Sequence, residues 1–101
     1  MKTLAFIRVI PIGTGGGSLS TYVAEALKVI KAHGLNFVIT PLGTGVEANS
    51  IHQVAEIINA ITSRLKELGV PRVGIDAYFD IRFDKEISLK YKVRSVEETL
   101  N

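Results

Sequence analysis

The amino-acid sequence predicts an α+β fold in which two amphipathic helices cover one face of a four-stranded antiparallel sheet. Two patterns lead to this prediction. Residues 73–83 alternate apolar and polar side chains, as in a strand with one covered and one open face. Residues 51–68 repeat apolar side chains at intervals of three and four, which is typical of a helix with one buried stripe.

The first third of the chain predicts a strand, a loop and a helix. Leu4 to Ile10 are rich in branched apolar residues and indicate a buried strand. The glycine-rich loop Gly13 to Gly17 follows, and Ser18 or Ser20 is placed to cap a helix that ends at Gly34. The apolar residues of this helix are Leu19, Val23, Ala26, Leu27 and Ile30.

Two short strands are predicted in the middle of the chain. They comprise Asn36 to Thr40 and Thr44 to Ala48, and Pro41 to Gly43 forms the turn between them. The second helix begins with a predicted capping box, in which the side chains of Ser50 and Gln53 each bind the backbone N–H of the other residue.

The second helix and the last strand complete the sandwich. The helix carries a clean apolar stripe and is stopped by Gly69 and Pro71. In the following strand, one face is apolar and the other polar. The stripe is Ile51, Val54, Ile58, Ile61, Leu65 and Leu68; the polar row is Gly74, Asp76, Tyr78, Asp80, Arg82 and Asp84.

The tail, residues 88–100, fits two patterns. It alternates like a strand from Ile87 to Val93, and it also repeats at helical spacing from Leu89 to Leu100. The helical pattern is longer, and Ser88 is placed to cap it, so we expect a short final helix. The order of strand, helix, strand, strand, helix, strand then predicts a ferredoxin-like sandwich, formed by residues 1–101 as one domain.

Composition limits the classes of function. The chain has no cysteine, which excludes disulfides and thiolate chemistry. Because it shows neither a signal peptide nor a membrane span, we expect a cytoplasmic protein that does not bind a membrane. The net charge of +2 is too weak and dispersed to indicate nucleic-acid binding. His33 and His52 lie on different helices without metal-ligand spacing, so neither a metal nor another cofactor is predicted.

A repeated pentapeptide marks the predicted ligand site. Pro11-Ile12-Gly13-Thr14-Gly15 recurs almost unchanged as Pro41-Leu42-Gly43-Thr44-Gly45, each time after an apolar run. Proline cannot donate to a strand ladder, and glycine permits unusual backbone angles, so each copy is expected at a strand exit with free backbone N–H groups. We expect the two threonine-bearing corners to lie close enough together to hold a small molecule.

The ordered set of short motifs along the chain resembles that of the small thiamine-binding protein family, and the resemblance covers nearly the whole chain. The motifs are Pro11-Ile12-Gly13-Thr14, Ser18-Leu19-Ser20, Tyr22-Val23, Gly34-Leu35, Pro41-Leu42-Gly43-Thr44, Val46-Glu47, Asp80-Ile81-Arg82 and Lys92-Val93-Arg94-Ser95-Val96. The resemblance implies a ferredoxin-like fold, homo-oligomers (often tetramers) built through the sheets, and binding of thiamine or its hydroxymethylpyrimidine half without catalysis. One departure is that Ala48 and Asn49 stand where the family usually has glycine and an acidic residue.

In this hypothesis, five residues form the ligand site. Thr14, Ser18 and Thr44 supply hydrogen bonds, Glu47 faces the positive charge or the amino group of the ligand, and Tyr78 stacks on its ring. A solvated or salt-bridged Glu47 is an equally good interpretation, and a glycine loop that is only a connection accounts for Gly13 to Gly17.

Two other functions remain open at this stage. The polar row of the last strand, joined by Arg8 if the first strand pairs with it, fits a structural or regulatory homo-oligomer without a dedicated ligand, or simply a solvated face with cross-strand ion pairs. An enzyme acting on a phosphorylated metabolite at the glycine loop ranks last, because the sequence offers no general base near that loop.

Overall fold

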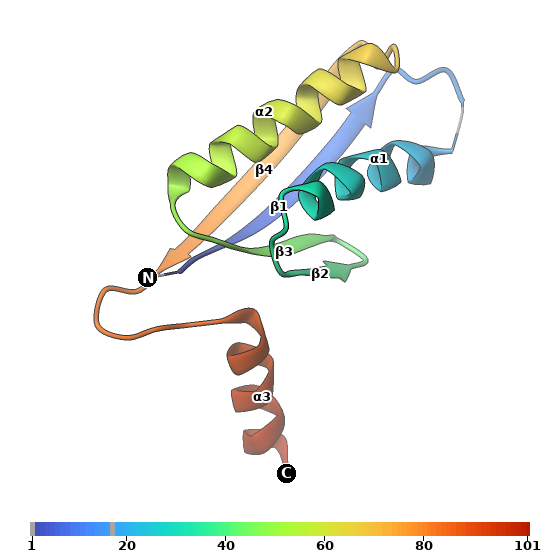
Figure 1. Cartoon of the computed structure of the whole chain (residues 1–101). Coiled ribbons are helices and arrows are strands. Elements are labelled where there is room, and N and C mark those ends of the chain that lie inside the picture. Colours follow the sequence, from blue (N-terminus) through green and yellow to red (C-terminus); the bar gives the residue numbers. More distant parts are fainter. Residues whose placement is uncertain (1, 17) are drawn as a thin grey trace.

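Four strands and three helices follow one another in the predicted order in a computed structural model, which describes residues 2–16 and 18–101 (Figure 1). Met1 and Gly17, the second of which belongs to the predicted glycine loop, lie outside the described residues. The elements are β1 (Thr3–Ile12), α1 (Leu19–Ala32), β2 (Phe37–Thr40), β3 (Gly43–Ala48), α2 (Ile51–Glu67), β4 (Arg72–Ile81) and α3 (Leu89–Leu100).

The four strands form one antiparallel sheet in the spatial order β2-β3-β1-β4. β1 pairs with β4 along its whole length and with β3 only from Thr3 to Ile7. This order, with α1 and α2 together on one side of the sheet, is the ferredoxin-like fold that the sequence predicts (Figure 1).

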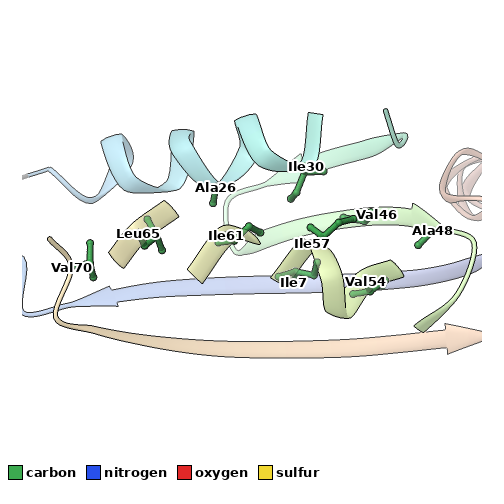
Figure 2. Packing of buried hydrophobic residues seen from close by; sticks show 11 residues of the cluster. Ile7, Ala26, Ile30, Val46, Ala48, Val54, Ile57, Ile61, Leu65 and Val70 are labelled. Atoms are coloured by element: carbon green, nitrogen blue, oxygen red, sulfur yellow. The ribbon is translucent and has the colours of Figure 1, made fainter. Parts of the chain in front are cut away.

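Strand alternation divides the side chains of the sheet between two faces. Ile7 of β1 is paired with Thr44 of β3 and with Ala77 of β4, so these three side chains point to the same side. That side is covered by the helices and holds the core (Figure 2). The buried cluster consists of Ala5, Ile7, Ala26, Ile30, Val46, Ala48, Val54, Ile57, Ile61, Leu65 and Val70. The opposite side, which we call the open face, carries the even-numbered residues of β1 and β4 and the odd-numbered residues of β3.

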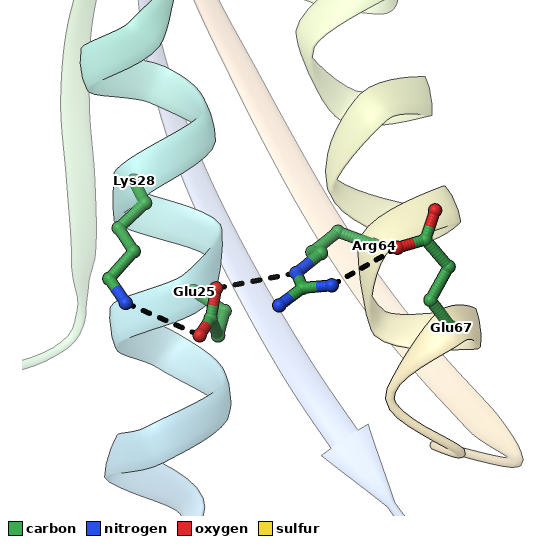
Figure 3. A network of polar contacts seen from close by, with 4 residues as sticks. All are labelled: Glu25, Lys28, Arg64 and Glu67. Carbon is green, nitrogen blue, oxygen red and sulfur yellow. Dashed lines mark hydrogen bonds and ion pairs between the residues drawn. The ribbon is translucent and has the colours of Figure 1, made fainter.

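An ion-pair network joins the two helices above the core (Figure 3). Glu25 of α1 accepts hydrogen bonds from Lys28 Nζ and from Arg64 Nε of α2, each at 3.3 Å. Arg64 also donates to Glu67 through Nη1 at 3.1 Å. The hydrogen bond from Lys28, followed by that from Arg64, holds the pKa of the Glu25 carboxyl below its usual value.

The structure differs from the predicted boundaries in β4 and β1. β4 ends at Ile81, so Arg82 and Asp84 of the predicted polar row lie beyond the strand. β1 continues to Ile12 instead of ending at Ile10, so Pro11 lies within it, opposite Val73. The last pair with β3 is Ile7 with Thr44, so Pro11 lies where β1 has β4 as its only register partner in the described sheet. Proline is tolerated at the edge of a sheet, where a strand has a neighbour on one side only.

The predicted tail helix is present, and the predicted caps are present with two changes. Ser50 Oγ accepts from the N–H of Gln53 at 3.1 Å, as expected. Gln53 Oε1, however, accepts from the N–H of Asn49 at 2.7 Å, one residue before the position that a capping box predicts. Ser18 is the N-cap residue of α1 but makes no capping hydrogen bond with its side chain.

The final helix α3 lies away from the main body of the sandwich (Figure 1). Ser88 caps it through a bond from the N–H of Tyr91, and none of its residues is buried. The radius of gyration is 14.8 Å, whereas a compact domain of this length has about 13 Å. The excess is the expected consequence of a helix that projects from the sandwich (Figure 1).

Candidate functional site

The five predicted site residues lie in three separate places within one chain. Thr14 and Ser18 are in the loop between β1 and α1, and Thr44 is on the helix-covered side of β3. Glu47 and Tyr78 are on the open face. Thr44 and Glu47 are three residues apart in one strand, and an odd separation places two side chains on opposite faces.

The two threonine-bearing corners, expected to be neighbours, are separated within the chain. Thr44 is level with Ile7 of β1, whereas Thr14 follows the end of that strand at Ile12. The five residue steps from Ile7 to Ile12 span roughly 16 Å at the usual rise of a strand. The extension of β1 beyond its contact with β3 therefore keeps Thr14 away from Thr44.

The glycine loop after β1 is shaped by backbone conformation. Gly13, Gly15 and Gly16 have φ of 78°, 75° and 92°, values that favour glycine. Ser18 Oγ lies 2.6 Å from Ser20 Oγ, so the two hydroxyls are hydrogen-bonded to each other. In this loop, the described glycines provide the turn from strand to helix.

Thr44 lines a pocket of about 160 Å³. The pocket lies between α1, β1 and the β2–β3 hairpin, and we call it the hairpin pocket. Its walls are mainly apolar and include Val23, Leu27, Ile39 and Leu42. Thr44 is only 8% exposed, whereas Ile39 and Leu42 at the mouth are 62% and 73% exposed. Mainly apolar walls, with the hydroxyls of Thr40 and Thr44 among the lining residues, suit a small, flat and weakly polar molecule.

The turn that borders this pocket is built around Thr40, which sequence reasoning missed. Its Oγ1 accepts from the N–H groups of Leu42 and Gly43 at 3.2 and 3.1 Å, and donates to the carbonyl of Gly43 at 2.9 Å. These N–H groups are therefore not free to bind a ligand, contrary to the expectation for the second pentapeptide. A threonine immediately before a Pro-X-Gly turn was the signal that could have revealed this.

Glu47 is buried, at 6% exposure, and the protein itself supplies its partners. Its Oε1 accepts from the backbone N–H of Leu89 at 2.6 Å, and its Oε2 accepts from Asn36 Nδ2 at 3.2 Å. Leu89 is the first residue of α3, so the carboxylate lies at the positive end of that helix. The structure thus gives Glu47 a role in holding α3, which sequence reasoning did not foresee.

Tyr78 is 69% exposed on the open face. It borders a shallow hollow with Phe6, Asp80, Leu89 and Lys92. The predicted partnership of Arg8 with the polar row is confirmed, since Arg8 Nε donates to Asp76 Oδ2 at 2.9 Å across β1 and β4. Lys92 of α3 forms an ion pair with Asp80 at 2.6 Å.

Two further properties of the described residues bear on function. No cluster of three or more histidine, aspartate or glutamate side chains suited to a metal ion occurs among residues 2–16 and 18–101. In the same part of the chain, no helix has the length and apolar character needed to cross a membrane.

Comparison with known proteins finds relatives over nearly the whole chain. The family model described as thiamine-binding protein matches residues 5–97. A UPF0045 protein of Methanothermobacter thermautotrophicus is 34% identical over 96 residues, which cover 95% of this chain and 97% of the relative. A UPF0045 protein of Staphylococcus xylosus is 37% identical over 97 residues, which cover 92% of this chain and 90% of the relative.

Solved structures share the fold. A hypothetical protein of Methanocaldococcus jannaschii superimposes with a TM-score of 0.84 at 28% identity, covering 96% of this chain and 97% of the other. A protein of Thermotoga maritima, provisionally named for thiamine biosynthesis or salvage, superimposes with a TM-score of 0.78, covering 95% and 99% of the two chains. At 21% identity, this second likeness concerns the fold alone.

Proposed function

Because the chain belongs to the thiamine-binding protein family, a family of small-molecule binders, we propose that it binds thiamine or a hydroxymethylpyrimidine-like ligand as a homo-oligomer, without catalysing a reaction. The observation that supports this most directly is the hairpin pocket. Its volume of about 160 Å³ is close to that of the engineered cavity of about 150 Å³ that binds benzene. One aromatic ring is therefore the right size for it.

The pocket favours the pyrimidine half of the ligand. A substituted pyrimidine ring between Val23, Leu27 and Ile39 would bury its two faces against apolar side chains. Thr44 would hydrogen-bond to a ring nitrogen or to the amino group. The thiazolium half of thiamine would pass the exposed side chains of Ile39 and Leu42 and remain in water, where its positive charge is solvated.

In this proposal, the other four predicted site residues do not contact the ligand within one chain. Glu47 and Tyr78 lie on the open face, behind the sheet from the pocket, and Thr14 and Ser18 lie beyond the end of β1. These four would meet the ligand only if a second subunit brought them to the pocket. A structural or regulatory oligomer without a ligand is the alternative, and the exposed apolar residues of the open face, such as Ile10 and Ile12, favour it.

Calorimetric titration of the purified chain with thiamine, with hydroxymethylpyrimidine and with the thiazole half alone tests the proposal. We expect heat from the first two and none from the third. Thr44→Val keeps the shape and removes the hydroxyl, so the dissociation constant should rise roughly threefold to tenfold, in line with one hydrogen bond.

A matched pair of α1 variants locates the site. Val23→Phe fills the hairpin pocket and should abolish binding, whereas Ala24→Phe, at an exposed position outside the residues that line the pocket, should leave it unchanged. Binding that survives Val23→Phe would place the ligand elsewhere. No heat with any ligand at millimolar concentration would favour the structural alternative.

A further inference from the structure

The final helix carries an apolar surface that its own chain leaves uncovered. Leu89, Val93, Val96 and Leu100, which we call the α3 stripe, are spaced by four, three and four residues. Val93, Val96 and Leu100 are 52%, 60% and 80% exposed, and exposure rises away from the sheet. A spacing of this kind places the four side chains along one side of the helix and is the pattern of helices that pair in a coiled coil.

The charges of α3 are arranged against the dipole of the helix. Lys90, Lys92 and Arg94 lie in its first half, and Glu97 and Glu98 lie in its last turn. An isolated helix is stabilised by the reverse order, with acidic residues first and basic residues last. Within one chain, this arrangement disfavours the helix.

We infer that the α3 stripe packs against the α3 stripe of a second copy of this chain, with the two helices antiparallel. With a two-fold axis between Val93 and Val96, Val93 of each chain would pack against Val96 of the partner subunit. The basic first half of each helix would then lie beside the acidic last turn of the other. Lys90, which flanks the stripe on the same side as Glu97, would pair with Glu97 of the partner subunit, and this pair would occur twice.

The contacts within the chain leave this side of the helix available. Lys92, on the other flank of the stripe, is already bound to Asp80. No ion pair among the described residues uses Lys90 or Glu97, and both border an open groove between α3 and β2, together with Val38 and Val93. The helix of a partner can therefore approach without displacing a contact that the chain already makes.

The α3 contact is small and supplements another interface. A helix of twelve residues is about 18 Å long, and a stable interface buries about 800 Å² per partner, so two such helices are too small to associate alone. The inference therefore rests on the homo-oligomer of the proposed function. In that assembly, the pairing of α3 helices would join units that associate through other surfaces.

Charge reversal tests the pairing, with assembly followed by sedimentation velocity and native mass spectrometry. Lys90→Glu and Glu97→Lys should each place two like-charged pairs across the contact and weaken this association step about tenfold, whereas the double variant should return to within about threefold of the unchanged chain. Glu98→Lys is the matched control, because it makes the same charge change one residue further on, off the flank of the stripe. It should leave assembly unchanged.

The sign of the Lys90→Glu effect separates pairing from a role in helix stability. A glutamate in the first turn favours the helix, so circular dichroism should show equal or greater helix content while assembly weakens. Val96→Asp, in the centre of the stripe, should abolish the α3 contact. The inference would be overturned if Lys90→Glu or Val96→Asp left assembly unchanged, or if the double variant did not restore assembly. A wild-type chain that stays monomeric would also overturn it.

Titration with thiamine keeps this inference apart from the proposed function. None of the residues that line the hairpin pocket belongs to α3, so each charge variant should bind ligand as the unchanged chain does. If neither the variants nor the wild type bind thiamine, the proposed ligand is wrong. The α3 contact would then still be judged from the assembly data alone.

Discussion

Gly43 and Gly45 lie in the same strand, and each makes room for a neighbouring side chain. A Cβ on Gly43 would meet the ring of Phe6 at 2.5 Å and the carbonyl oxygen of Ile7 at 2.9 Å. A Cβ on Gly45 would come to 3.4 Å from Leu89 of α3. The glycines of the second pentapeptide therefore serve close packing on the open face, whereas those described in the first serve a positive φ.

This difference predicts unequal effects of alanine. Gly43→Ala forces the Phe6 ring and the backbone of β1 apart, so we expect a loss of about 2 kcal/mol in the free energy of unfolding. Gly45→Ala meets only the flexible end of Leu89 and should cost less than about 1 kcal/mol. Urea denaturation of both variants measures the two values. Equal losses would show that Phe6 moves aside without cost.

At the scale of elements, α3 is attached to the sandwich through polar contacts at its first turns. The N–H of Leu89 is bound by Glu47 and the side chain of Lys92 by Asp80, and Leu89 lies over Gly45. The anchor is effective because Glu47 is buried, is bound by Asn36 as well, and faces the positive end of the helix. The position of α3 thus depends on a carboxylate that is distant in sequence.

Removing this carboxylate should release the helix. In Glu47→Ala, we expect the amide of Leu89 to exchange with solvent roughly tenfold faster, equivalent to the 1–2 kcal/mol typical of a lost capping bond. Glu47→Gln retains an acceptor and should give a smaller effect. Glu56→Ala, an exposed glutamate of α2, is the control. Hydrogen exchange followed by nuclear magnetic resonance makes the comparison, and unchanged protection at Leu89 in Glu47→Ala would refute the anchor.

At the scale of the whole molecule, the packed core and the projecting helix are separate. The buried cluster comes from the sheet, α1 and α2, and α3 contributes no buried residue to it. Ile87, just before α3, is still buried at 5% exposure. Stability should therefore reside in the part of the chain that ends at Ile87, whereas α3 should matter for assembly.

A chain that stops after Ile87 tests this division. We expect it to unfold in one cooperative thermal transition, with a midpoint less than about 10 °C below that of the full chain at low protein concentration, because α3 has no buried residue and few contacts, such as those of Leu89 and Lys92, are lost. Differential scanning calorimetry gives the midpoint. Loss of the cooperative transition would mean that α3 is part of the folding unit.

The sequence alone determined the elements, their order and most of their ends. Residues 51–68 have a helical period and residues 73–83 a strand period, although the strand itself ends at Ile81. Both periods follow from the local geometry of a helix or a strand with one buried side. Ser50, Ser88 and Gly34 act at helix ends through contacts within a few residues. Strand alternation alone also places Thr44 and Glu47 on opposite faces of the sheet, so this part of the site could be predicted from the sequence.

Only the tertiary structure decided which of these residues meet. The register of β1 with β3 ends at Ile7, which separates Thr14 from Thr44. The hairpin pocket forms where α1 passes the β2–β3 turn, and Glu47 meets Leu89 from 42 positions away. Such contacts depend on how twisted strands and packed helices fill space together, and no local period in the chain encodes them.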